Sequence, residues 1–95
     1  MLVEGRHVRQ TGSPGRYAVV RLRVEAGAGF EFVDETAPGF PPEFVAATRR
    51  GVEATLGSLT DIRVTLVEAK DHLVDSSERD FEIAAEQAIS KALEL

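Results

Sequence analysis

Apolar residues recur along this chain with two different periods, which separate predicted strands from predicted helices. In residues 17–24 apolar and polar side chains alternate, so this segment is predicted to be a strand whose arginines lie on its outer face. Similar patterns predict strands over residues 2–10, 30–33 and 61–68. Because only short turns join the first three of these strands, we expect them to form an antiparallel meander.

Two further segments place apolar residues at helical spacing. The first is predicted to begin near Pro42 and to end at Gly57, and it tolerates Gly51 because of close packing on the sheet. The second is predicted to begin within residues 75–78, where Ser77 with Asp80, or Asp75 with Glu78, can cap the first amides. Its buried stripe is predicted to contain Phe81, Ala84, Ala85, Ala88, Ile89, Ala92 and Leu93. The element order β-β-β-α-β-α predicts an α+β fold, a two-layer sandwich with both helices on one face of the sheet.

Length and composition predict one soluble globular domain over residues 1–95. No apolar run approaches the roughly 20 residues that a membrane span requires, so no membrane partner is expected. The chain has no cysteine, which excludes disulfides and thiolate chemistry and is compatible with a cytoplasmic location. A net charge of −5 argues against DNA binding or general nucleic-acid binding by the whole surface.

One segment of this acidic chain is strongly basic. Between Gly5 and Val24 there are five arginines, and all 16 acidic residues of the chain lie outside this segment. Such a local concentration of positive charge suits contact with phosphate groups. It equally suits a solvated hairpin whose arginines balance the acidic remainder of the chain. The charge pattern alone leaves both interpretations open.

The sequence predicts neither a catalytic centre nor a bound cofactor. It lacks the glycine-rich loop with a lysine that cradles nucleotide phosphates. The two histidines, His7 and His72, have no nearby companions with which to form a metal site, so no metal is expected. Asp75, Glu78 and Asp80 are explained by helix capping and the helix dipole. We therefore expect a protein that is not an enzyme.

Four segments, taken in order, nevertheless carry a specific signature. They read His7-x-x-Gln10-Thr11-Gly12-x-x-Gly15-x-Tyr17, Gly29-Phe30-Glu31-Phe32-Val33, Asp61-Ile62-Arg63-Val64-Thr65-Leu66 and His72-x-Val74-Asp75-Ser76-Ser77-Glu78-x-x-Phe81-x-Ile83-Ala84. This series, which covers essentially the whole chain, resembles domain IV of the bacterial translational GTPase elongation factor G. The same domain occurs in the related ribosomal protection proteins.

The resemblance implies a fold and a role. The fold would be β-β-β-α-β-α with a left-handed β-α-β crossover, and the domain would enter the ribosomal decoding centre during translocation. Two tip loops, residues 10–16 and 69–73, would contact small-subunit ribosomal RNA and the transfer RNA and messenger RNA. The residues implied in this contact are Arg9, Gln10, Thr11, Gly12, Ser13, Gly15, Arg16 and His72. Any use of GTP would belong to domains that this sequence does not contain.

An alternative role remains open at the level of sequence. The connection between the first helix and the following strand is short, Pro14 alters the first loop, and Asp71 places a carboxylate beside His72. Together with the acidic body, these features are compatible with a protein-interaction or structural module that kept the fold and lost ribosome binding. An enzyme is the third and weakest alternative, because fold class by itself excludes no activity.

Overall fold

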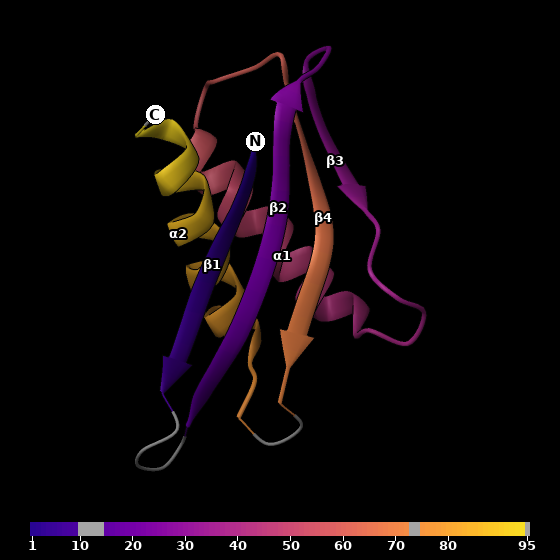
Figure 1. Cartoon of the computed structure of the whole chain (residues 1–95), viewed down its shortest axis with the longest axis vertical. Helices are drawn as coiled ribbons and strands as arrows, with labels where there is room; N and C mark the ends of the chain where they lie inside the picture. Colours follow the sequence, from indigo (N-terminus) through magenta and orange to yellow (C-terminus); the bar gives the residue numbers. More distant parts are fainter. Residues whose placement is uncertain (10–14, 73–74, 95) are drawn as a thin grey trace.

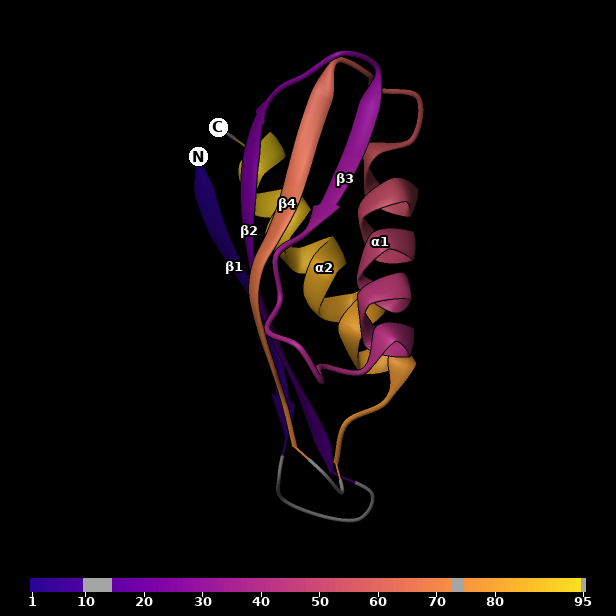
Figure 2. The same cartoon turned by 90° about the vertical axis from the view of Figure 1, so that its right-hand side faces the viewer.

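The computed structural model describes residues 1–9, 15–72 and 75–94. The strands are β1 (Leu2–Arg9), β2 (Arg16–Ala26), β3 (Phe30–Asp34) and β4 (Ile62–Asp71), and the helices are α1 (Pro42–Leu56) and α2 (Glu78–Leu93). Both helices cover the same face of the sheet and leave the other face open, as Figure 2 shows. The predicted α+β class, the element order and the two-layer arrangement are therefore confirmed.

The order of strands in the sheet corrects one prediction. The sheet has the order β1-β2-β4-β3, so the first three strands do not form a meander. β4 lies between β2 and β3, antiparallel to β2 and parallel to β3. A central place suits β4 because Val64, Thr65 and Leu66 are all buried. Thr65 faces away from the helices, but Arg23 and Val33 flank it in register on the two neighbouring strands and cover it.

The connection from β3 through α1 to β4 has an uncommon handedness. Figure 1 shows β3 and β4 side by side with both arrows pointing down, β3 on the right and α1 behind the sheet. This arrangement is a left-handed crossover, whereas about 98% of parallel β-α-β connections are right-handed. The left-handed crossover expected from the resemblance is therefore present.

Two glycines allow α2 to approach its neighbours closely. A Cβ atom added to Gly5 on β1 would lie against the backbone carbonyl oxygen of Ala84, so any side chain there would push the helix away. A Cβ atom at Gly51 would meet the carbonyl of Glu82 and the side chain of Ala85. Gly51 therefore packs on α2 and not on the sheet, which corrects the prediction made for it.

The core lies between the sheet and the two helices. Phe81 is fully buried, with its ring stacked on Phe44 at 4.6 Å between centroids and the edge of Phe40 at 5.8 Å. The fully buried residues of α2 include five of the predicted stripe: Phe81, Ala84, Ala85, Ala88 and Ile89. The buried stripe does not continue to the end of the helix, where the Leu93 side chain is 47% exposed.

The predicted helix ends are confirmed. Ser77 is the N-cap of α2, and its hydroxyl accepts a hydrogen bond from the backbone N–H of Asp80 at 3.2 Å. Pro42 stands in the first turn of α1, and Gly57 follows its last residue with a φ of 61°. A left-handed backbone at this position favours glycine, which has no Cβ atom to clash.

Candidate functional site

The two predicted tip loops begin and end at the same end of the sheet. Arg9 and Arg16 are the last paired residues of β1 and β2, so the first loop starts at this pair. β4 ends at Asp71, which pairs with Ala18 on β2, two residues from the same point. Figures 1 and 2 show the end of β1, the start of β2 and the end of β4 at the lower end of an elongated molecule whose extents are 41 × 29 × 19 Å. We call this region the loop end.

The bounds of the second loop are narrower than expected. β4 continues to Asp71, so residues 69–71 belong to the strand and not to the loop. In the first loop, Arg16 is the first residue of β2. Gln10, Thr11, Gly12 and Ser13, for which the resemblance implies RNA contact, lie outside the described residues, as does Leu73 of the second loop.

A serine joins the bases of the two loops. The hydroxyl of Ser76 donates a hydrogen bond to the carbonyl oxygen of Tyr17 on β2 at 2.7 Å. The Ser76 hydroxyl oxygen also accepts a hydrogen bond from the backbone N–H of His72, again at 2.7 Å. The carbonyl of His72 in turn accepts hydrogen bonds from the backbone N–H groups of Asp75 and Ser76. These contacts fix the position of the second loop relative to β2.

Side chains reinforce this contact between the loops. The rings of Tyr17 and His72 lie 6.0 Å apart, within the range of aromatic interaction. His72 Nδ1 is 3.4 Å from a carboxylate oxygen of Asp75, and the His72 side chain is 48% exposed. A Cβ atom at Gly15 would lie 2.7 Å from the Asp75 carboxyl group. A larger residue at position 15 would therefore require the Asp75 side chain to move.

Sequence reasoning missed a buried acid, Asp80, which lies near the ends of β1 and β2 from which the first loop starts. The side chain of Asp80 is 2% exposed, and its Oδ1 is 3.7 Å from His7 Nε2 and 3.8 Å from Arg16 Nε. The sequence assigns Asp80 to helix capping, and its N–H does take part in the cap. Its place among polar neighbours in the first turn of α2 gives no sign that the side chain points inward toward two strands.

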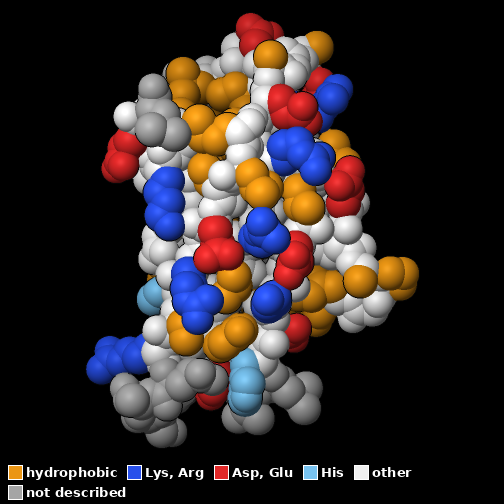
Figure 3. Space-filling model, viewed as in Figure 1, with side chains coloured by type: hydrophobic (Ala, Val, Ile, Leu, Met, Phe, Trp, Pro, Cys, Tyr) orange, Lys and Arg blue, Asp and Glu red, His pale blue; other side chains and the backbone are white. Residues whose placement is uncertain are grey.

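The five arginines of the basic segment do not gather at one place. Arg21 pairs with Glu68 at 3.5 Å and Arg23 with Glu35 at 3.9 Å on the open face of the sheet. Figure 3 shows basic and acidic side chains interspersed over this face. Arg9 and Arg16 alone stand at the loop end, and within the described residues Arg9 forms no ion pair. The phosphate-contact interpretation therefore applies to this pair and not to the whole segment.

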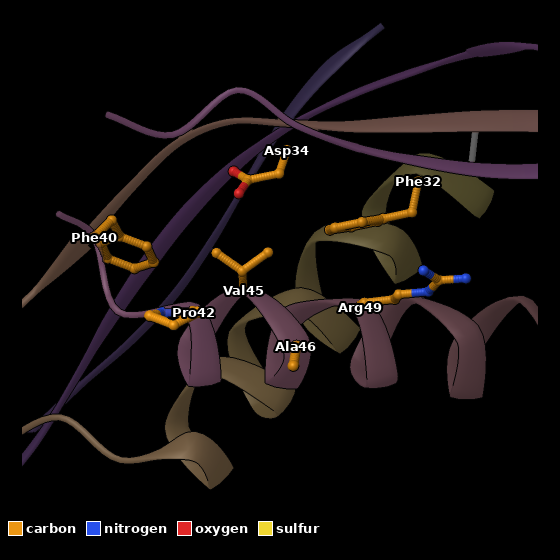
Figure 4. Close-up of a pocket in the computed structure, with 7 residues that line it drawn as sticks. All are labelled: Phe32, Asp34, Phe40, Pro42, Val45, Ala46 and Arg49. Carbon is orange, nitrogen blue, oxygen red and sulfur yellow. The ribbon is translucent and has the colours of Figure 1, made fainter. Parts of the chain in front are cut away.

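A groove lies between β3 and α1. Its volume is about 390 Å³, and it is lined by Phe32, Asp34, Phe40, Pro42, Val45, Ala46 and Arg49 (Figure 4). Both charged groups are already engaged: the Asp34 carboxylate accepts two hydrogen bonds from Thr36, and Arg49 Nε donates to Glu53. None of the lining residues belongs to the loop end.

Within the described ranges, no three His, Cys, Asp or Glu residues are grouped so that they could hold a metal ion. Neither helix in that part of the chain is long and apolar enough to cross a membrane.

Comparison with known proteins gives one consistent family. The family model for elongation factor G, domain IV, matches residues 2–95. An elongation factor G-like protein of Mycobacterium tuberculosis strain CDC 1551 is 38% identical over 99 residues, and so is its counterpart in strain H37Rv. In each case the match covers 93% of this chain and 14% of the relative.

A solved structure agrees with this assignment. The crystal structure of a Thermus thermophilus protein superposes with a TM-score of 0.85 and 28% sequence identity, over 95% of this chain and 15% of that one. The chain thus spans about one seventh of the length of the proteins that it matches. With a full-length family match and a shared fold, the chain belongs to the elongation factor G domain IV family, a family of translation-factor domains.

Proposed function

We propose that this chain acts as a non-catalytic ribosome-contacting arm, whose loop end enters the decoding centre during translocation. The contacts would be made by Arg9, Gln10, Thr11, Gly12, Ser13, Gly15, Arg16 and His72. The partners would be small-subunit ribosomal RNA and the bound transfer RNA and messenger RNA. The chain would act in the cytoplasm, without membrane or DNA, and would depend on other domains for GTP.

The observation that carries this proposal is the joining of two loops at the narrow end of an elongated molecule. Ser76 bonds both loop bases, and the rings of Tyr17 and His72 meet across them. Loop bases that are already held together lose little conformational freedom on binding, which favours affinity. Arg9 and Arg16 add charge suited to phosphate, and a half-exposed His72 has a ring suited to stacking or hydrogen bonding with RNA.

The proposal is tested by co-sedimentation of the chain with purified 30S subunits over a range of salt concentrations. We expect binding that weakens as salt rises, because phosphate contacts release counterions. Alanine at Arg9, Arg16 and His72 should abolish most of the binding and lower the salt slope by about 2, one unit for each arginine.

The matched control is the double variant Arg21→Ala and Arg23→Ala, which removes the same number of arginines from the open sheet face. It should bind 30S subunits nearly as the wild-type chain does. Equal losses in the two variants would mean that charge anywhere on the molecule suffices, which contradicts a contact by the loop end. Absence of salt-sensitive binding by the wild-type chain would favour the protein-interaction module instead.

A further inference from the structure

The carboxylate of Asp80 lies in surroundings that stability does not explain. Its Oδ2 is buried and has no hydrogen-bond partner within the described part of the chain. Its Oδ1 lies beyond hydrogen-bonding distance of His7 Nε2 and Arg16 Nε, at 3.7 and 3.8 Å. Burying a charge with incomplete pairing costs free energy, and an apolar side chain of similar size would avoid that cost. The carboxylate is therefore of interest for what it does to its neighbours.

The neighbour that matters most is Arg16. The atom of its guanidinium group that faces Asp80 is Nε, and the side chain as a whole is 44% exposed. A guanidinium group has five N–H donors, of which Nε supplies one. An acid placed on the Nε edge leaves the two terminal NH₂ groups available to a second anion. Arginine commonly binds phosphate with two parallel hydrogen bonds of this kind.

The register of β1 and β2 explains why such an anchor is needed. Arg9 and Arg16 are directly paired across the strands, and like charges in that position repel. The acid that lies near Arg16 is Asp80, in the first turn of α2. It restrains Arg16 against this repulsion, and its position at the start of a helix favours a negative charge there.

We propose that Asp80 is a positioning residue, which holds Arg16 by its Nε edge so that the rest of the guanidinium group meets a phosphodiester of bound RNA. This inference rests on the proposed function, because it assigns to one arginine of the loop end a defined mode of phosphate contact. Asp80 itself does not touch the RNA.

The first test examines the free protein and needs no ribosome. The Nε–H signal of Arg16 is followed by nuclear magnetic resonance in the wild-type chain and in Asp80→Asn, which keeps the shape and removes the charge. We expect the signal to shift and its hydrogen exchange to accelerate about tenfold, because the ion pair between the Arg16 guanidinium group and the Asp80 carboxylate is lost. Glu78→Gln is the matched control: it removes one charge from the same helical turn, where Glu78 pairs with Arg50.

The second test is a double-mutant cycle on 30S co-sedimentation. Asp80→Asn should weaken binding about fivefold, which corresponds to roughly 1 kcal/mol, whereas Glu78→Gln should not weaken it. In an Arg16→Gln background, Asp80→Asn should have no further effect, since the arginine through which it acts is gone. Arg16→Lys keeps the charge but lacks the Nε edge, and it should also be insensitive to Asp80→Asn.

The outcomes separate the two proposals. An Arg16 signal that is unchanged in Asp80→Asn overturns the anchoring contact, even if the chain binds ribosomes. A loss of binding in Asp80→Asn that persists in the Arg16→Gln background overturns the action through Arg16. Failure of the wild-type chain to bind 30S subunits overturns the proposed function and, with it, the phosphate contact assigned to Arg16.

Discussion

Two regions of the molecule differ in how their side chains meet: the layer between the sheet and the helices, and the loop end of the sheet. In the layer, Gly5 on β1 lies so close to α2 that no methyl group fits, and Gly51 brings α1 equally close to α2. At the loop end, polar side chains meet through single hydrogen bonds, and a carboxylate oxygen of Asp80 is buried without a partner among the described residues. The comparison indicates that the layer provides most of the stability, whereas the loop end carries the polar contacts for which we propose a role in binding RNA.

The largest expected effect tests the layer. Phe81→Ala removes the ring that Phe40 and Phe44 contact and leaves a cavity, so unfolding should become easier by about 4 kcal/mol. Urea unfolding measures this loss. Leu59→Ala, at a residue 50% exposed, is the control and should change stability by less than about 0.5 kcal/mol. A loss for Phe81→Ala below about 1 kcal/mol would show that the layer is not the source of stability.

The second prediction concerns the close approach of β1 and α2. Gly5→Ala places a methyl group against the carbonyl oxygen of Ala84, so either the strand or the helix must move. The expected cost is about 3 kcal/mol, measured by thermal or urea unfolding. Gly39→Ala is the control, because no atom lies within 4 Å of its added Cβ and only its φ of 93° opposes the change. It should cost about 1 kcal/mol, and equal costs at the two positions would contradict the close contact.

The third prediction moves to the loop end. Ser76→Ala breaks the two hydrogen bonds that join the loop bases, and we expect a loss of about 2 kcal/mol in unfolding free energy. It should also weaken 30S binding, since the two loops would no longer be held together. Ser90→Ala on the exposed side of α2 serves as control. Full 30S affinity in Ser76→Ala would separate the joining of the loops from ribosome contact.

The smallest expected effect depends on pH and concerns Glu31, which lies at the end of the sheet opposite the loop end. The pKa of Glu31 is lowered, first by the hydrogen bond from the backbone N–H of Ala28 and then by Arg63. A carboxyl with a lowered pKa in the folded state adds stability above its unfolded pKa and loses it as pH falls through the folded pKa. Glu31→Gln should therefore slightly lower the melting temperature at neutral pH and lose this effect at acidic pH, once the pH has fallen below the folded pKa of Glu31. An equal effect at both pH values would contradict an ionic origin.

The sequence predicted the helices better than the sheet. The bounds and caps of α1 and α2 follow from local signals such as Pro42, Gly57 and Ser77, which act within one turn of the chain. The place of β4 between β2 and β3 follows from no local signal. It depends on which strand can be buried on both sides, and a sequence pattern does not say which strands are neighbours.

The candidate site was predicted only in part. The resemblance and the charge pattern pointed to Arg9, Gly15, Arg16 and His72, and the structure brings these four to one end of the sheet. Asp80 was assigned to the helix cap alone, because its inward orientation depends on how α2 sits against β1 and β2. The ion pairs of Arg21 and Arg23 were likewise missed, since their acidic partners are distant in sequence.

By itself, the sequence determined the element types, their order and the family, because hydrophobic period, capping residues and motif spacing are properties of the chain alone. Only the tertiary structure decided the strand order, the buried position of Asp80 and the division of the arginines between an open face and a loop end. The physical reason is that charges and hydrogen bonds act over a few ångströms in space, and folding alone sets which distant residues come that close.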